Sequence, residues 1–253
     1  MSAGALTLIP LAGLPDVAAG DDLAGLIVAA LGRAGQRLEP GDAIVVAQKI
    51  VSKAEGRKVQ LAGVTPSAKA EDLAAAAQKD PRQMELLLRE TRSVLRARPG
   101  VVVVEDRRGL VLANAGIDAS NVSVIEGEVL LLPEDPDASA ARLRAALHAA
   151  TGVAPAVLVI DSIGRAWRLG TVGTAIGVAG MEALTDLRGR PDMHGRPLQT
   201  TEVGQADELA AAASLVMGQA DERCPAVLVR GLALAGDGKA ADLVRPRDLD
   251  MFR

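Results

Sequence analysis

Short, continuous apolar runs are the clearest feature of the hydrophobic pattern along this chain. A short apolar run bounded by turn-forming residues is typical of a strand buried on both faces. Such runs predict strands over 43–47, 101–104, 110–112, 129–132, 156–160 and 226–229.

Alanine-rich or amphipathic stretches between these runs predict helices over 22–31, 138–150 and 206–217. A further helix is expected to begin at Pro81, because an acidic cap (Asp80) followed by proline is a strong helix start. The Ala/Gly/Lys-containing stretch 60–70 indicates a mobile loop or insertion. Strands and helices do not alternate regularly, which favours an α+β fold with mixed, largely antiparallel sheets and packed helices over a doubly wound parallel sheet.

Composition narrows the classes of protein. The 253 residues are 49% hydrophobic but only 1% aromatic, so Leu, Val, Ile and Ala must build the core. That length fits a single domain over 1–253, with two interlocked subdomains as an alternative. The net charge is -4, and the short run Asp106-Arg107-Arg108 is expected to be solvated surface charge. With no basic tract and no aromatic stacking platform, no nucleic acid partner is expected.

Targeting and cysteine signals are equally sparse. No apolar run approaches the roughly 20 residues of a membrane helix, and the first ten residues lack the basic start of a signal peptide. We therefore expect a cytoplasmic protein with no membrane partner. The single cysteine, Cys224, precedes a buried-looking run and is expected to be a small core residue.

Known nucleotide-binding motifs are missing from the sequence. Gly238-Lys239 lacks both the upstream glycine and the following Ser/Thr of a P-loop. Gly170, Gly173 and Gly177 do not have the G-x-G-x-x-G spacing, and are expected to mark tight turns or close backbone packing.

Two acidic segments are candidates for a divalent metal site. Asp118 lies in a Gly/Ser/Asn-rich segment after an apolar run, which suits a hard-cation ligand, and Asn121 could reach a phosphate or a ribose. Asp161 and Ser162 follow the run 156–160. By spacing alone two alternatives stay open: a turn in which Asp118 and Asn121 satisfy backbone amides, and a helix cap by Asp161 or Ser162.

Other polar positions leave similar alternatives. Lys49 and Lys53 follow the predicted strand 43–47 and could meet phosphates, or could simply be solvated. Glu208 opens an alanine-rich helix, where an acid usually stabilises the helix N-terminus without any further role.

In combination, several blocks resemble the coenzyme F420-0:L-glutamate ligase (F420 gamma-glutamyl ligase) family. The blocks, in the family's order, are Leu8–Pro15, Gly41–Arg57, Asn114–Asn121, Leu131–Ser139, Asp161–Gly170 and Ala206–Ala213. The resemblance implies an uncommon α+β fold and an intertwined homodimer with its site near the subunit boundary. It also implies the single-domain form, without the C-terminal nitroreductase-like domain of some relatives.

The activity implied by the resemblance is a GTP-dependent ligation. Family members join L-glutamate to the terminal carboxylate of coenzyme F420-0 through an acyl phosphate, release GDP and phosphate, and add further gamma-linked glutamates to products such as F420-1. Mg²⁺ or Mn²⁺, and K⁺, are the implied cofactors. Two other functions stay open: a metal-dependent nucleotide phosphohydrolase and a non-catalytic nucleotide-binding module.

The resemblance also implies roles for individual residues, although it assigns no catalytic residue. The implied metal ligands are Asp118, Asp161, Ser162 and Glu208. The implied nucleotide contacts are Leu14, Pro15, Asp16, Val17, Gln48, Lys53 and Asn121. Ser162 stands where many members have threonine, and Gln48 where relatives can have serine.

Overall fold

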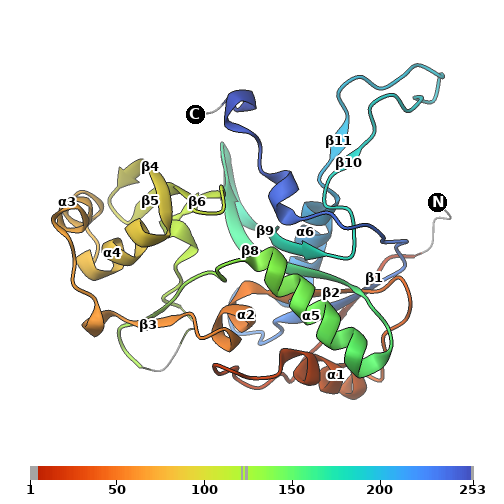
Figure 1. Cartoon of the computed structure of the whole chain (residues 1–253), viewed down its shortest axis with the longest axis horizontal. Coiled ribbons are helices and arrows are strands. Elements are labelled where there is room, and N and C mark those ends of the chain that lie inside the picture. The colour runs from red at the N-terminus through yellow and green to blue at the C-terminus, as the bar shows by residue number, and fades with distance from the viewer. Residues whose placement is uncertain (1–4, 121, 123–124, 252–253) are drawn as a thin grey trace.

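A five-stranded sheet forms the centre of the protein, in a computed structural model that describes residues 5–120, 122 and 125–251 (Figure 1). Its strand order is β1-β12-β2-β8-β9. The strands are β1 (Thr7–Pro10), β2 (Ala43–Ala47), β8 (Ala156–Arg165), β9 (Arg168–Ala179) and β12 (Ala226–Arg230). Neighbours pair antiparallel except β2 and β8, which run parallel.

Helices cover both faces of this sheet, because side chains alternate along each strand. Val157 and Val159 of β8 pack in one core with residues from α1, α2 and α5. Ala156 and Leu158 pack in a second core with residues from α6. The helices are α1 (Leu23–Arg33), α2 (Gln48–Ala54), α5 (Pro136–Thr151) and α6 (Gln205–Met217). Burial on both faces explains why these strands read as continuous apolar runs.

Residues 57–131 form a small lobe beside the sheet, and the rest of the described chain forms a large lobe (Figure 1). The small lobe contains β3 (Lys58–Gln60), α3 (Ala68–Ala77), α4 (Pro81–Glu90), β4 (Thr91–Arg98), β5 (Val101–Asp106), β6 (Val111–Ala113) and β7 (Glu128–Leu130). β3 pairs with β7, and β4, β5 and β6 form a sheet in that order. This lobe has a third core, centred on fully buried side chains such as Met84 and Leu87.

Short elements complete the chain. A hairpin of β10 (Thr185–Asp186) and β11 (Glu202–Val203) projects from the large lobe (Figure 1). Short 3-10 helices cover Leu61–Gly63, Asn114–Gly116, Ala240–Leu243 and Arg247–Leu249. Within the described part of the chain, every helix is too short or too polar to span a membrane.

Most predicted elements are confirmed. The fold is α+β with largely antiparallel sheets. Asp80 caps α4, with its carboxylate accepting from the Arg82 amide and Pro81 at the first turn. Cys224 is buried. The prediction of one domain over the whole chain stays a prediction.

Two predictions are wrong. The stretch 60–70 is not one continuous loop: it holds a 3-10 helix and, after residues 64–67, the start of α3, whose cap Ser67 accepts from the Ala70 amide. Asp106 and Arg108 are not solvated surface charge. The Asp106 side chain is fully buried, and Arg108 donates to it over 2.8 Å.

Glycines allow the helices to lie directly on β9, as their spacing predicts. A Cβ built on Gly177 would overlap the Pro136 carbonyl at the start of α5, and one on Gly173 would overlap the Ala210 carbonyl of α6. These obstacles are backbone atoms, so a larger side chain could be accommodated only by moving a helix. The two glycines therefore set how closely α5 and α6 approach the sheet.

We expect Gly177→Ala to lower the free energy of unfolding by about 2 kcal/mol, because the added methyl group forces α5 away from β9. Urea unfolding followed by circular dichroism measures the change. Gly164→Ala is the matched control, since a Cβ there meets open space in β8. Equal stability of the two variants would contradict the close-approach explanation.

Candidate functional site

The parallel pair β2 and β8 places Asp161 beside the start of α2. Ala47, the last residue of β2, lies opposite Ile160. The chain then turns into α2 at Gln48, whereas β8 continues through Asp161 to Arg165. Asp161 is therefore inside a strand, and the alternative of a helix cap is wrong.

Asp118 reaches the same place from the small lobe. Its backbone forms a bridge with Leu130 of β7: each residue donates its amide to the other's carbonyl, with nitrogen-to-oxygen distances of 2.9 and 2.8 Å. Its side chain accepts a hydrogen bond from the Gln48 amide at 2.8 Å, and the Lys49 ammonium lies 3.4 Å away. Both partners belong to α2, so side chains of that helix hold the Asp118 carboxylate.

Both carboxylates have raised pKa values. Burial, and then the neighbouring charge of Asp118, raise the pKa of Asp161 to about 6. Burial also raises the pKa of Asp118, although the Lys49 ammonium opposes that shift. A pair of partly desolvated acids with one nearby lysine has excess negative charge, which is a common property of functional sites.

The donor set fits a hard divalent cation. Carboxylate oxygens are the ligands preferred by Mg²⁺ and Mn²⁺, and Mg²⁺ typically takes one or two carboxylates and completes its shell with water and substrate phosphates. Among the described residues, no group of three or more His, Cys, Asp or Glu side chains is placed to hold a metal by itself. Asp118 and Asp161 therefore suit an ion shared with a phosphate-bearing ligand.

The other predicted metal ligands lie elsewhere. Because side chains alternate along β8, Ser162 faces away from Asp161, and its hydroxyl donates to Oε1 of Gln219 at 2.6 Å. Glu208 is exposed in the first turn of α6, the helix that covers that second face. Their roles as metal ligands stay predictions, and Gln219 is a polar neighbour that the sequence analysis did not identify.

The predicted nucleotide contacts gather around α2. Val17 packs in the same core as Ile50 and Val51 of this helix. Burial and the neighbouring Lys58 lower the pKa of Lys53, while the charge of Asp16 raises it, so segment 14–17 lies close to that lysine. Asn121 lies outside the described residues.

Lys49 lies in the candidate site. Its position in the sequence is also consistent with a solvated side chain. Besides its ion pair with Asp118, its ammonium donates to the Ser120 carbonyl at 3.1 Å. The signal was its position directly after a buried strand, but only the fold shows that Asp118 lies opposite.

A cavity of about 220 Å³ lies next to this group, against β9. Its walls include Leu110, Asp207 and Arg245, together with Thr174. Thr174 is the strand partner of Asp161, so the cavity is one strand away from that carboxylate. Burial raises the pKa of Asp207, which accepts a hydrogen bond from the Ala175 amide.

The acidic pair should lower the stability of the metal-free protein. The folded-state pKa of Asp161 lies above its ordinary value of 3.8, so the folded chain binds the proton more tightly than the unfolded chain. Stability therefore falls as the pH rises from about 4 to about 6. A pKa shift of this size lowers the free energy of unfolding by about 3 kcal/mol at neutral pH.

We expect Asp161→Asn to be more stable than the parent at pH 7 without metal, by a few kcal/mol at most, and the difference to vanish near pH 4. Thermal unfolding across this pH range measures it. Asp186→Asn is the contrasting variant, because hydrogen bonds from Arg188 lower the pKa of Asp186 to about 2 and its loss should destabilise. A less stable Asp161→Asn protein at pH 7 would contradict the assignment.

Comparisons with known proteins identify the family of this chain. The family model for F420-0:Gamma-glutamyl ligase matches residues 13–231. Coenzyme F420:L-glutamate ligase of Methanothermobacter thermautotrophicus is 49% identical over 251 residues, covering 98% of this chain and 99% of the relative. The proteins of that name from Methanopyrus kandleri and Archaeoglobus fulgidus are 46% and 42% identical, over 92% and 97% of this chain and 92% and 96% of their own lengths. A match of this extent confirms the resemblance, and the chain belongs to the F420-0:gamma-glutamyl ligase family.

Proposed function

We propose that this protein uses GTP to ligate L-glutamate to the terminal carboxylate of coenzyme F420-0 and then adds further gamma-linked glutamates. The printed names of its relatives contain coenzyme F420 and L-glutamate. The structural observation that carries the proposal is the half-buried pair Asp118 and Asp161, flanked by Lys49 on α2.

A carboxylate is a poor electrophile, so amide formation requires its activation. In the proposed reaction a carboxylate oxygen of the acceptor attacks the γ-phosphorus of GTP, and GDP leaves. The glutamate amine, after losing a proton, attacks the acyl phosphate, and inorganic phosphate leaves with the C–O bond electrons. Mg²⁺ or Mn²⁺, when bound, offsets the charge that develops on the transferred phosphoryl group.

The residues around α2 support such a site. Asp118 and Asp161 provide carboxylates for the cation, and Gln48 fixes the orientation of Asp118. The Ser52 hydroxyl donates to Oε1 of Gln48 at 2.8 Å, so the amide presents its NH₂ group to the carboxylate. In the proposed complex Lys49 and Lys53 supply positive charge for the phosphates.

We assign the remaining predicted residues to the nucleotide and to further cations, and the cavity beside β9 to the acceptor. Segment 14–17 and Asn121 would contact the nucleotide, while Ser162 and Glu208 would serve a second cation, with K⁺ a further candidate. The cavity lined by Thr174 and Arg245 would admit the acceptor, because a guanidinium there offers a partner for a carboxylate.

We expect the mass of coenzyme F420-0 to increase by one or more glutamyl units when the protein is supplied with GTP, Mg²⁺ or Mn²⁺, and L-glutamate. Asp118→Asn should reduce the rate by at least about 100-fold, because it removes a carboxylate from the cation and the phosphates. Mass spectrometry measures the products. Asp72→Asn, an exposed position on α3, is the control and should keep the parent rate.

Other outcomes identify the competing functions. Phosphate release that is independent of the acceptor and of glutamate would indicate a nucleotide phosphohydrolase. Binding of GTP without metal dependence or turnover would indicate a non-catalytic module. Either result, with no glutamyl product, would overturn the proposed ligation.

We also propose a homodimer that involves the β8–β9 hairpin. This hairpin extends beyond the last residue of β2, and its tip carries Trp167 and Leu169, which are 81% and 98% exposed. Large apolar side chains that gather at one exposed tip favour a protein interface.

The double variant Trp167→Ser, Leu169→Ser should weaken self-association at least about tenfold, since apolar anchors carry much of an interface's binding energy. Sedimentation equilibrium measures it. Met193→Ser, which removes an equally exposed apolar side chain from the β10–β11 hairpin, is the control. A monomeric parent protein would refute the dimer.

A further inference from the structure

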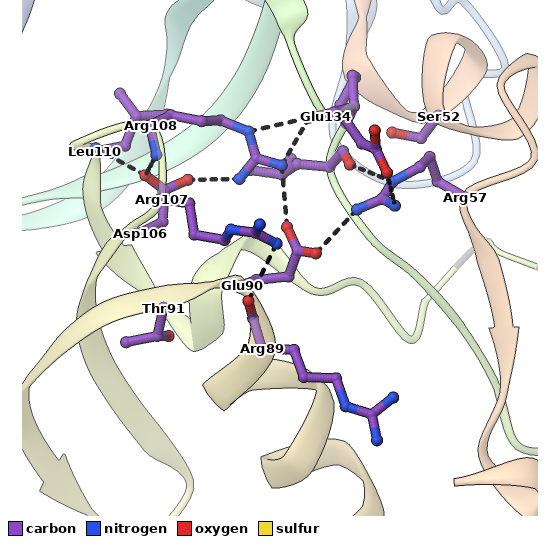
Figure 2. Close-up of polar contacts among 12 residues, drawn as sticks. Ser52, Arg57, Arg89, Glu90, Thr91, Asp106, Arg107, Arg108, Leu110 and Glu134 are labelled. Carbon is purple, nitrogen blue, oxygen red and sulfur yellow. Dashed lines mark hydrogen bonds and ion pairs between the residues drawn. The ribbon is translucent and has the colours of Figure 1, made fainter.

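A buried acid at the end of α4 binds two arginines at the junction of the two lobes. Glu90 is the last residue of this helix, and each of its carboxylate oxygens accepts from a different arginine: Arg57 at 3.0 Å and Arg108 at 3.1 Å (Figure 2). The three side chains are only 9%, 17% and 12% exposed, respectively. We call these three residues the Glu90 cluster.

The same two arginines also hold the segment that returns to the large lobe. Arg57 donates through Nε to the Leu132 carbonyl at 2.9 Å, and Arg108 donates through Nε and Nη2 to the Pro133 carbonyl at 3.0 and 2.6 Å. The chain leaves the large lobe at Arg57 and re-enters it after residue 131. The Glu90 cluster therefore holds both connections between the lobes (Figure 2).

Stability alone does not account for this arrangement. An acid at a helix C-terminus is opposed by the helix dipole. A buried ion pair commonly contributes no more than an apolar contact of the same size, because desolvating the charges offsets their attraction. Such a network does provide directional bonding. Each Glu90 oxygen accepts from a different arginine, and each arginine also donates to a backbone carbonyl, which restricts the relative arrangement of the partners.

That arrangement continues directly into the candidate site. Leu131 donates its amide to the Arg57 carbonyl at 3.1 Å, and the preceding residue, Leu130, forms the bridge with Asp118. From Arg57 the chain also runs back through α2 to Gln48, whose side chain bonds to the Asp118 carboxylate. The cluster and the carboxylate pair thus lie at opposite ends of one short frame built from α2 and β7.

We propose that Glu90, with Arg57 and Arg108, is a positioning group that holds Asp118 at the correct separation from Asp161. Glu90 acts through the backbone of β7 and has no contact with the reacting groups. The metal-binding part of this inference rests on the proposed function, whereas the mechanical part concerns the folded chain alone.

Glu90→Gln tests the proposal, because the neutral side chain weakens the bonds to both arginines and removes the carboxylate that they share. Within the described residues, Arg57 then keeps only its ion pair with Glu134, and Arg108 only its ion pair with Asp106. Asp42→Asn is the matched control. Asp42 is 2% exposed and accepts from Arg230 at 2.9 and 2.8 Å, but it precedes β2 at the end of the strand away from α2. Arg108→Lys is a second variant, which keeps the charge and loses the planar fork.

Two measurements follow each protein. Hydrogen exchange at the amides of Asp118, Leu130 and Leu131 reports the frame directly, and the Mn²⁺ signal in electron paramagnetic resonance reports cation affinity. In Glu90→Gln and Arg108→Lys we expect exchange at these amides to accelerate at least about tenfold and the Mn²⁺ dissociation constant to rise by about tenfold or more. In Asp42→Asn both should match the parent, although its melting temperature falls.

The outcomes separate this inference from the proposed function. Parent-like exchange at Leu130 and Leu131 in a folded Glu90→Gln protein would overturn the positioning role. Faster exchange with unchanged Mn²⁺ affinity would overturn its link to Asp118. If the parent protein itself bound no Mn²⁺, the proposed metal site would fail, while the exchange measurement would still decide the mechanical part.

Discussion

The parallel pairing of β2 with β8 is the constraint on which the candidate site depends. Two parallel strands cannot be joined by a tight turn, so a long crossover must connect them. Here the crossover is residues 48–155, which include α2, the whole small lobe and α5. The connection that allows the parallel pair is therefore also the segment that carries Asp118 back to Asp161. In open sheets, ligands commonly bind at the carboxyl ends of parallel strands, which is where these two acids meet.

The two acids of the candidate site lower the stability of the folded protein at neutral pH. Burial raises the pKa of both Asp161 and Asp118, and the charge of Asp118 raises that of Asp161 further, so the metal-free protein holds two carboxylates in a place where water solvates them poorly. Lys49 offsets part of this charge. In the proposed complex, a cation that binds only the folded state would recover the lost stability.

Local signals account for the features that were predicted from the sequence. The apolar runs of β2 and β8, and the Asp80–Pro81 start of α4, are encoded within a few residues. The end of β8 was not predicted, because residues 161–165 extend beyond β2 and lack its apolar pattern. The alanine-rich start of α3 has little amphipathic contrast and therefore resembles a loop in the sequence, although Ser67 is an available cap signal.

Long-range electrostatic partners could not be predicted in the same way. Asp118 was identified from its loop, but its partners Gln48 and Lys49 lie about 70 residues away in the sequence. The sequence around Arg108 favours solvated surface charge, because a charged side chain looks the same in sequence whether water or a buried carboxylate surrounds it. Periodicity reveals which face of an element is apolar, and carries no information about which buried acid an arginine meets.

This difference also explains why an ion-pair network suits the junction of the lobes. An apolar junction would bury comparable area, but dispersion contacts have little directionality and tolerate sliding of one surface over another. Glu90 instead receives one arginine on each oxygen, and each arginine also holds a carbonyl of the returning chain. Sliding would break several of these bonds at once and leave charges buried without partners, which is costly. A frame that must keep two mutually repelling carboxylates at a set separation requires this kind of resistance.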